Sequence, residues 1–242
     1  MEQLRSLIVE NAAVALAVGG LVIGIVFGAV VQRTNFCTMG SLSDMLNFGD
    51  GRRFRSWWLA TATAVLGVAL LRGPLGIDLS KTMYLSPTLD WAGAAIGGLM
   101  FGFGMVFAGG CASRNLVRIG TGDLRSLVVI VVVALTGYMA IGGLLGPTRA
   151  AIASATSIDL SAAGMASQSL GAFAARFLGL APASADTIMA VVVAAAIAAW
   201  CFADGPFRTS PIHIVGGVGV GLCVLAGWML TGLAVDDLAD KP

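Results

Sequence analysis

Residues 12–31 read AAVALAVGGLVIGIVFGAVV and contain no charged side chain. At about 1.5 Å per residue, a helix of this length crosses the roughly 30 Å hydrocarbon core of a bilayer. The run is longer than the apolar part of a signal peptide, Glu10 precedes it, and a series of glycines replaces the usual leucine-rich core. We therefore expect a retained membrane-spanning helix here.

The rest of the chain has the same apolar character. Of its 242 residues, 57% are hydrophobic and 11% are charged, and the mean hydropathy is +0.91. A soluble domain has about 25% charged residues, so this composition excludes a soluble globular fold and predicts a protein embedded in the lipid bilayer. The net charge of +1 provides no basic field for nucleic acid, and we expect no such partner. Further apolar runs lie at 56–71, 91–109, 126–146, 186–203 and 210–233.

Two segments do not fit simple spans. The run at 56–71 has 16 residues, which favours a half-length or re-entrant helix buried in protein. The stretch 150–180 is rich in alanine and serine, and we expect it to lie at the membrane interface. The prediction is an all-α integral membrane protein, a polytopic helical bundle with internal repeats and short or re-entrant helices, forming one domain over 1–242.

The chain contains an internal repeat. Gly19-Gly20-Leu-Val-Ile-Gly24 leads to Cys37, and Gly97-Gly98-Leu-Met-Phe-Gly102 leads to Cys111. Each unit closes with a Gly-Asp pair and then Arg-Ser, so the units cover about 12–56 and 91–126. Repeats with helices broken at matching positions indicate the binding site of a transporter. The two spans between the cysteines would bring both to the same membrane face.

The second unit contains Phe-Ala-Gly-Gly-Cys-Ala-Ser-Arg-Asn at 107–115. Its double glycine frees the backbone before a polarizable thiol, and the next residues can start a half-helix whose N–H groups and positive dipole end suit an anion. The residues predicted to line a substrate path are Cys37, Thr38, Gly40, Gly109, Gly110, Cys111, Ser113, Arg114 and Asn115, with Arg33, Asn35 and Trp91 as further candidates.

The other cysteines, the single histidine and the arginines also have purely structural interpretations. Cys201 and Cys223 lie among Ala, Val and Leu, as packing cysteines do, and His213 stands near the start of the last span. Arg33 and Arg114 fit membrane-edge arginines equally well. We find no catalytic, metal-binding or cofactor-binding motif.

Charge distribution predicts the orientation. Arginines concentrate in the loops 49–55 and 114–125, which should therefore face the cytoplasm. Fewer basic residues fall on the other side, namely Arg5, Arg72, Lys81, Arg149, Arg176 and Lys241.

Residues 35–40, 107–114, 208–211 and 227–232 resemble the YeeE/YedE family of bacterial inner-membrane proteins, the sulfur-transport group associated with thiosulfate uptake. The resemblance implies a multi-pass protein of the bacterial inner membrane, a transporter or channel rather than an enzyme, with no cofactor. It also implies that thiosulfate or a related sulfur anion passes along cysteine thiols, which places Cys37 and Cys111 on the path.

The resemblance has a gap, because full-length family members carry a second Gly-Cys motif beyond the segment that ends here at Pro242. We therefore expect a missing C-terminal cysteine motif or a second family subunit that completes the path. Small TusA-like sulfur-carrier proteins accompany the family and are a further expected partner. The alternative function is a membrane thiol enzyme that handles sulfane sulfur or electrons through Cys111 and Cys37.

Overall fold

The computed structural model describes residues 12–72, 85–165, 167–179 and 182–239. The ends of the predicted domain and the charges at Arg5, Lys81 and Lys241 lie outside these residues. The helices are α2 (Ala12–Thr34), α3 (Thr38–Phe48), α4 (Arg52–Arg72), α5 (Trp91–Phe107), α6 (Ala112–Gly120), α7 (Leu124–Ile141), α8 (Gly146–Thr156), α9 (Leu170–Leu178), α10 (Pro182–Phe202), α11 (Gly205–Arg208) and α12 (Pro211–Ala239), with a 3-10 turn η2 (Leu160–Ala163). Two-residue strands β1 (Thr88–Leu89) and β2 (Ile158–Asp159) pair antiparallel.

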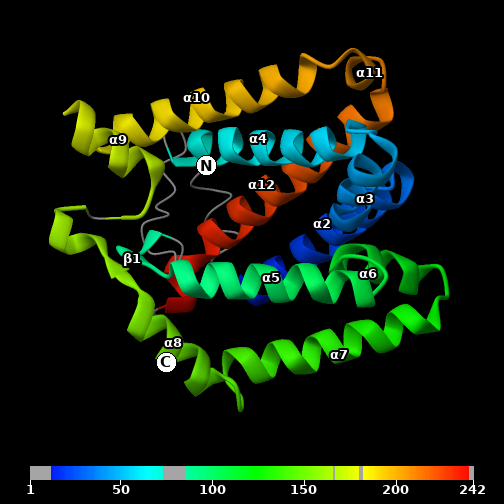
Figure 1. Cartoon of the computed structure of the whole chain (residues 1–242), viewed down its shortest axis with the longest axis horizontal. Coiled ribbons are helices and arrows are strands. Elements are labelled where there is room, and N and C mark those ends of the chain that lie inside the picture. The colour runs from blue at the N-terminus through cyan, green and yellow to red at the C-terminus, as the bar shows by residue number, and fades with distance from the viewer. Residues whose placement is uncertain (1–11, 73–84, 166, 180–181, 240–242) are drawn as a thin grey trace.

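The first layer of the fold consists of α2, α4, α10 and α12 (Figure 1). Helix α12 contacts both α2 and α4, and glycines allow the close approach. A Cβ on Gly217 would lie 2.7 Å from the carbonyl oxygen of Ser56 in α4, and one on Gly19 would meet the side chain of Leu230. Val31, Ala60 and Val220 form a buried cluster where the three helices meet. Small residues therefore set this packing, as in other membrane bundles.

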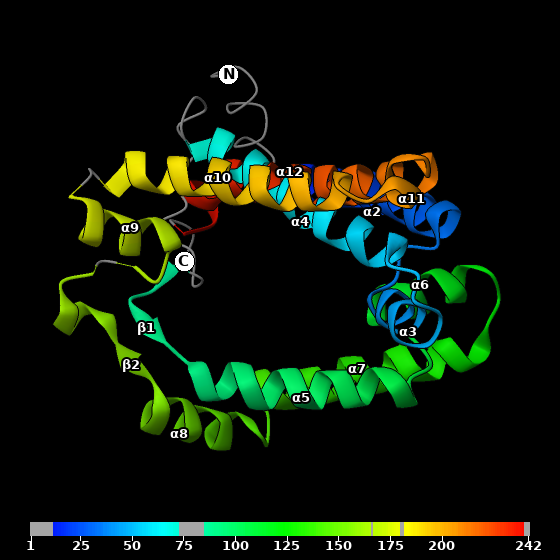
Figure 2. The same cartoon turned by 45° about the horizontal axis from the view of Figure 1, so that its top comes forward.

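The second layer contains α5, α7 and α8, and Figure 2 shows it apart from the first. The layers meet at one end through α3 and α6, and β1 and β2 lie at the other end. In the most apolar window of each span, 39% of the residues are buried in α4 but only 6% in α7 and 11% in the span that includes α5. Most of the apolar surface of α5 and α7 is therefore not covered by the rest of the described chain.

Within the described residues, six helical segments are long and apolar enough to cross a membrane. They are 13–48, 52–71, 91–120, 124–141, 184–202 and 211–232. This confirms an all-α polytopic membrane protein, and the first apolar run is part of the 23-residue helix α2.

The prediction for 56–71 was wrong. Helix α4 has 21 residues and is long enough to span, because it begins at Arg52 and includes the arginines that were assigned to a loop. Long arginine side chains at a helix start keep their guanidinium groups at the membrane edge while the helix continues. The short helices are α3, with 11 residues, and α6, with 9. The 150–180 stretch consists mainly of short elements, α8, β2, η2 and α9.

Candidate functional site

Both repeat cysteines stand directly before a short helix. Cys37 is the N-cap of α3, and its sulfur accepts a hydrogen bond from the Gly40 N–H at 3.4 Å. Cys111 is the N-cap of α6. The expectation that residues after Cys111 start a helix is confirmed, since α6 begins at Ala112. The positive ends of two helix dipoles therefore lie at the two thiols.

The breaks before these helices need unusual backbone conformations. Gly109 has φ +64° and Gly110 φ +158°, both in the region that disfavours a Cβ atom. At the other break Asn35 has φ +51°, and asparagine tolerates this left-handed conformation better than most residues. The double glycine is therefore required for the turn from α5 into α6.

The two thiols meet although 74 residues separate them. Cys37 Sγ and Cys111 Sγ are 3.6 Å apart, and both residues are buried, with 7% and 4% of their surface exposed. The sulfur of Cys111 also lies 3.2 Å from Ser113 Oγ. Both cysteines are free thiols. The pair joins α3 and α6 at the end where the layers touch (Figure 2).

The side chain of Asn115 stabilises the break between α5 and α6 through hydrogen bonds to its backbone. It is 1% exposed, and its amide nitrogen donates toward the carbonyl oxygens of Gly110 at 3.2 Å and Cys111 at 3.3 Å. Its side-chain oxygen accepts from the Ser126 hydroxyl of α7 at 3.0 Å. The side chain of this predicted path residue is therefore hydrogen-bonded to the loop that carries Cys111 and to α7.

Arg53 of α4 stabilises the break between α2 and α3. Its guanidinium donates to the Asn35 carbonyl oxygen and to Asp44 Oδ2, each at 2.7 Å. A Cβ on Gly40 would lie against this guanidinium and would have to displace it. Thr38 is held separately, because its hydroxyl accepts from Trp57 Nε1 at 3.2 Å.

A cavity of about 500 Å³ opens beside the thiol pair. Asp44 lines it together with the basic side chains Arg53, Arg114, Arg118 and His213. Arg53 Nε and Arg114 Nη1 are buried and have no hydrogen-bond partner in the part of the chain that the structure describes. Such orphaned donors are rare in native proteins, and a bound anion would satisfy them. The cavity is lined by Thr34, Asn35, Cys37, Met39, Gly40, Ser43, Asp44, Arg53, Gly109, Gly110, Arg114, Arg118, Ile212 and His213.

The structure brings most predicted residues to this place but not all. Thr38, Cys111, Ser113 and Asn115 stand next to the cavity without lining it. Arg33 and Trp91 are exposed and outside the lining. Trp91 opens α5, whose far end carries the break, so about 24 Å of helix separates it from Phe107.

Three basic cavity residues, Arg53, Arg118 and His213, were missing from the predicted site. Arg53 and Arg118 lie in the two stretches used to assign orientation, and both bind carbonyl oxygens at the breaks. Arginines follow both cysteines in the sequence, and this pattern could have identified Arg53 and Arg118 as site residues.

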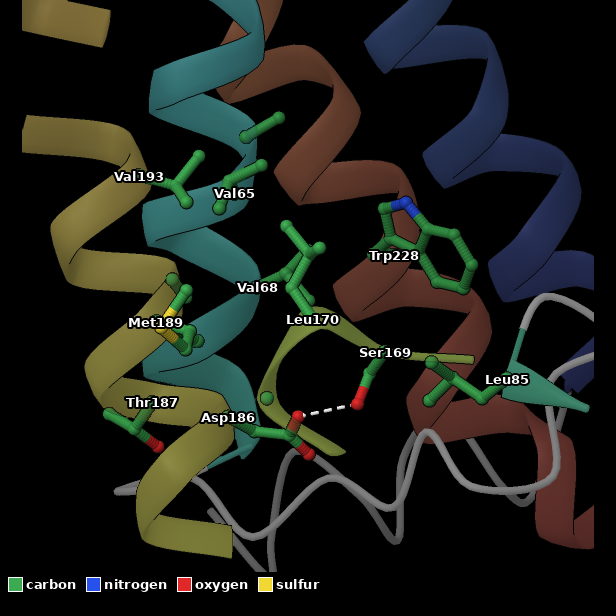
Figure 3. Close-up of a pocket in the computed structure, with 14 residues that line it drawn as sticks. Val65, Val68, Leu85, Ser169, Leu170, Asp186, Thr187, Met189, Val193 and Trp228 are labelled. Atoms are coloured by element: carbon green, nitrogen blue, oxygen red, sulfur yellow. Dashed lines mark hydrogen bonds between the residues drawn. The ribbon is translucent and has the colours of Figure 1, made fainter. Parts of the chain in front are cut away.

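A second cavity, of about 460 Å³, lies toward the opposite ends of α4 and α12 (Figure 3). Val65, Val68, Leu170 and Trp228 are among the apolar side chains that line it. Its carboxylate, Asp186, accepts a hydrogen bond from Ser169 Oγ at 2.7 Å. This cavity has a carboxylate and no basic side chain among its described lining residues, whereas the first cavity has four basic side chains, so the candidate anion site is the first cavity.

Two carboxylates outside the spans are held ionised near the cysteine end. Hydrogen bonds from the Arg52 guanidinium lower the pKa of Asp50 to about 2. The Ser126 hydroxyl, and then the Arg125 N–H, lower the pKa of Asp123. Each carboxylate precedes a spanning helix and accepts from its first turn.

Comparison with known proteins assigns the sequence to a described group. Residues 33–237 match the family described as sulphur transport. The thiosulfate transporter TsuA of Escherichia coli is 33% identical over 116 residues, which are 48% of this chain and 32% of that protein. TsuA of Spirochaeta thermophila is 40% identical over 106 residues, 43% of this chain and 30% of the relative.

A third relative, the probable transporter YedE of Escherichia coli, is 30% identical over 107 residues, 43% of this chain and 24% of its own length. The matched segment therefore spans about a third or less of these relatives. All three are named transporters, which agrees with the expectation that the chain is not an enzyme.

Proposed function

The chain belongs to the sulphur transport family, and from that premise we propose that it is a transporter that binds thiosulfate or a related small sulfur anion beside Cys37 and Cys111. The observation that carries the proposal is the contact of two buried thiols, 3.6 Å apart, at the N-termini of two short helices. The cationic cavity beside them supports the same ligand charge.

The proposed path has two parts. Arg114 and Arg53 attract the anion into the cavity, where their buried N–H groups lack partners among the described residues. The S–H group of Cys37, which lines the cavity, then donates a weak hydrogen bond, and the S–H group of Cys111 behind it is the next donor along the path. Weak donors hold an oxyanion briefly, and conduction requires sites that the ligand can leave. Gly109 and Gly110 expose the backbone there, and Ser113 provides a hydroxyl beside Cys111.

We further propose that the protein lies in the bacterial inner membrane, with the basic cavity facing the cytoplasm. The excess of arginines at the cysteine end supports this orientation. The arginines at 52–55 and 118–125 then form a basic surface for a TusA-like carrier protein.

We also propose, separately from the path at the two cysteines, that a second family subunit covers α5 and α7. We take the units 12–56 and 91–126 as repeats. Helices α2 and α4, which begin in the first unit, are covered by α12. In the second unit a Cβ on Gly97, Gly98 or Gly102 would meet no described atom within 4 Å, and Leu99 and Phe103 are 77% and 71% exposed. A glycine-rich helix from another chain would fit this face as α12 fits the first.

A membrane thiol enzyme is the second candidate, because two thiols in contact are also what sulfur or electron exchange needs. An enzyme requires a nucleophilic thiolate, so Cys111→Ser and Cys111→Ala should both abolish it. A hydrogen-bonding path keeps part of its function with serine, whose hydroxyl also donates.

The test is uptake of labelled thiosulfate by a bacterium that lacks its own importers and expresses this chain, with sulfate as competitor. We expect uptake that sulfate does not block, a fall of about tenfold in Cys111→Ala and a smaller fall in Cys111→Ser. Cys223→Ala is the matched control, since Cys223 is a buried cysteine of α12 outside the cavity lining. Equal uptake by wild type and Cys111→Ala, at equal membrane expression, would refute the proposed path.

A further inference from the structure

The contact between Cys37 and Cys111 is close enough for a covalent bond to form. Their sulfur atoms are 3.6 Å apart and unbonded. A disulfide has an S–S distance of about 2.05 Å, so the two sulfurs need to approach by about 1.5 Å. Both residues are N-caps that follow a backbone break, where a small rotation disturbs no helix interior.

We propose that Cys37 and Cys111 form a reversible disulfide that closes the anion site, and that a small-molecule disulfide is the oxidant. In the first step the thiolate of one cysteine attacks the oxidant, which forms a mixed disulfide and releases one thiol. In the second step the other cysteine attacks the protein sulfur of the mixed disulfide and releases the second thiol. Overall two protein thiols and one disulfide give one protein disulfide and two small thiols, so atoms and electrons balance.

Access decides which cysteine reacts first. Cys37 lines the 500 Å³ cavity, whereas Cys111 is not among the lining residues and lies against Cys37 and Ser113. An oxidant in the cavity therefore meets Cys37, and Cys111 resolves the mixed disulfide.

The other two cysteines lie apart from this chemistry. Cys201 is fully buried and donates to the Arg55 carbonyl oxygen, and Cys223 is buried in α12. Neither lines the cavity. They can be replaced by alanine to leave one reactive pair.

The disulfide changes the site in two ways. It removes both S–H donors, and it ties the start of α3 to the start of α6, the two short helices at which the layers meet. If the proposed function holds, oxidation therefore stops the passage of the anion and reduction restores it.

The chemical test uses the purified full chain with Cys201→Ala and Cys223→Ala, treated with bis(2-hydroxyethyl) disulfide, then alkylated, digested and analysed by mass spectrometry. We expect a peptide pair joined through Cys37 and Cys111. With Cys111→Ser added, the reagent should remain attached to Cys37, whereas Cys37→Ser should leave Cys111 largely unmodified. Absence of the joined pair, or attachment at Cys111 in preference to Cys37, would overturn the proposal.

The functional test repeats thiosulfate uptake before and after oxidation, and again after dithiothreitol. We expect oxidation to lower uptake by about tenfold and reduction to restore it. A disulfide that forms without lowering uptake overturns the proposed closure. Because the mass measurement needs no transport, a chain that forms the disulfide but takes up no thiosulfate supports the disulfide and contradicts the proposed function. A chain that takes up thiosulfate but forms no disulfide supports the proposed function and contradicts the disulfide.

Discussion

Asn115→Ala should destabilise the loop that presents Cys111. The amide group of Asn115 has two hydrogens, which are shared among the carbonyl oxygens of Gly110 at 3.2 Å, Cys111 at 3.3 Å and Ala108 at 3.4 Å. A net value of about 0.5–1.5 kcal/mol per hydrogen bond gives a loss of about 2 kcal/mol. The hydrogen bond from Ser126 to the Asn115 side-chain oxygen is not counted, because that hydroxyl also reaches Asp123 at 2.9 Å.

The assay is thermal unfolding of the purified protein in detergent, followed by circular dichroism. For a chain of this size about 2 kcal/mol corresponds to a fall in Tm of about 4–8 °C. Asn47→Ala is the matched control, since Asn47 is exposed and donates only to Ser43 among the described residues. Its effect should stay within about 0.5 kcal/mol. If both variants melt at the same temperature, the bracing role of Asn115 is refuted.

Three further predictions concern backbone conformation, helix packing and charge. Gly109→Ala should lower Tm by a few degrees, because φ +64° costs a residue with a Cβ about 1–2 kcal/mol. Gly221→Ala should also lower Tm, since its methyl would lie 2.8 Å from a backbone oxygen of α4; Gly227→Ala, which meets no described atom within 4 Å, should not. The pKa of Asp50 is lowered to about 2, from about 3.9 in an unfolded chain, so its pairing with Arg52 stabilises the fold above about pH 4 and this contribution disappears as the pH falls toward 2. In melting curves recorded across that range, Asp50→Asn should lose this part of the pH dependence, which is small because the pair is largely exposed; an unchanged pH dependence would contradict it.

The sequence predicts much of this fold because its signals are local. Uncharged runs locate the membrane helices, and the double glycine before Cys111 locates a break that the structure has at Gly109 and Gly110. The length of α4 was missed because the uncharged run begins at Ser56, whereas the helix begins four residues earlier among arginines.

The site was harder to predict because it depends on how distant segments are placed. The cysteine pattern indicates one membrane face, but the 3.6 Å contact requires the relative positions of α3 and α6. Arg53 resembles any membrane-edge arginine until its bond to the Asn35 carbonyl is seen. Asn115 follows the motif as a candidate ligand, yet its bonds turn inward to the backbone.

The most direct test of the central claim is the binding of thiosulfate to the purified chain, because binding is measured without transport. Calorimetric titration should show binding to the wild type and to Cys223→Ala with the same Kd. In Cys37→Ala, which removes one of the two thiol donors, we expect Kd to rise by about tenfold in protein whose circular dichroism matches that of the wild type. Equal Kd values for the wild type and Cys37→Ala would contradict the account.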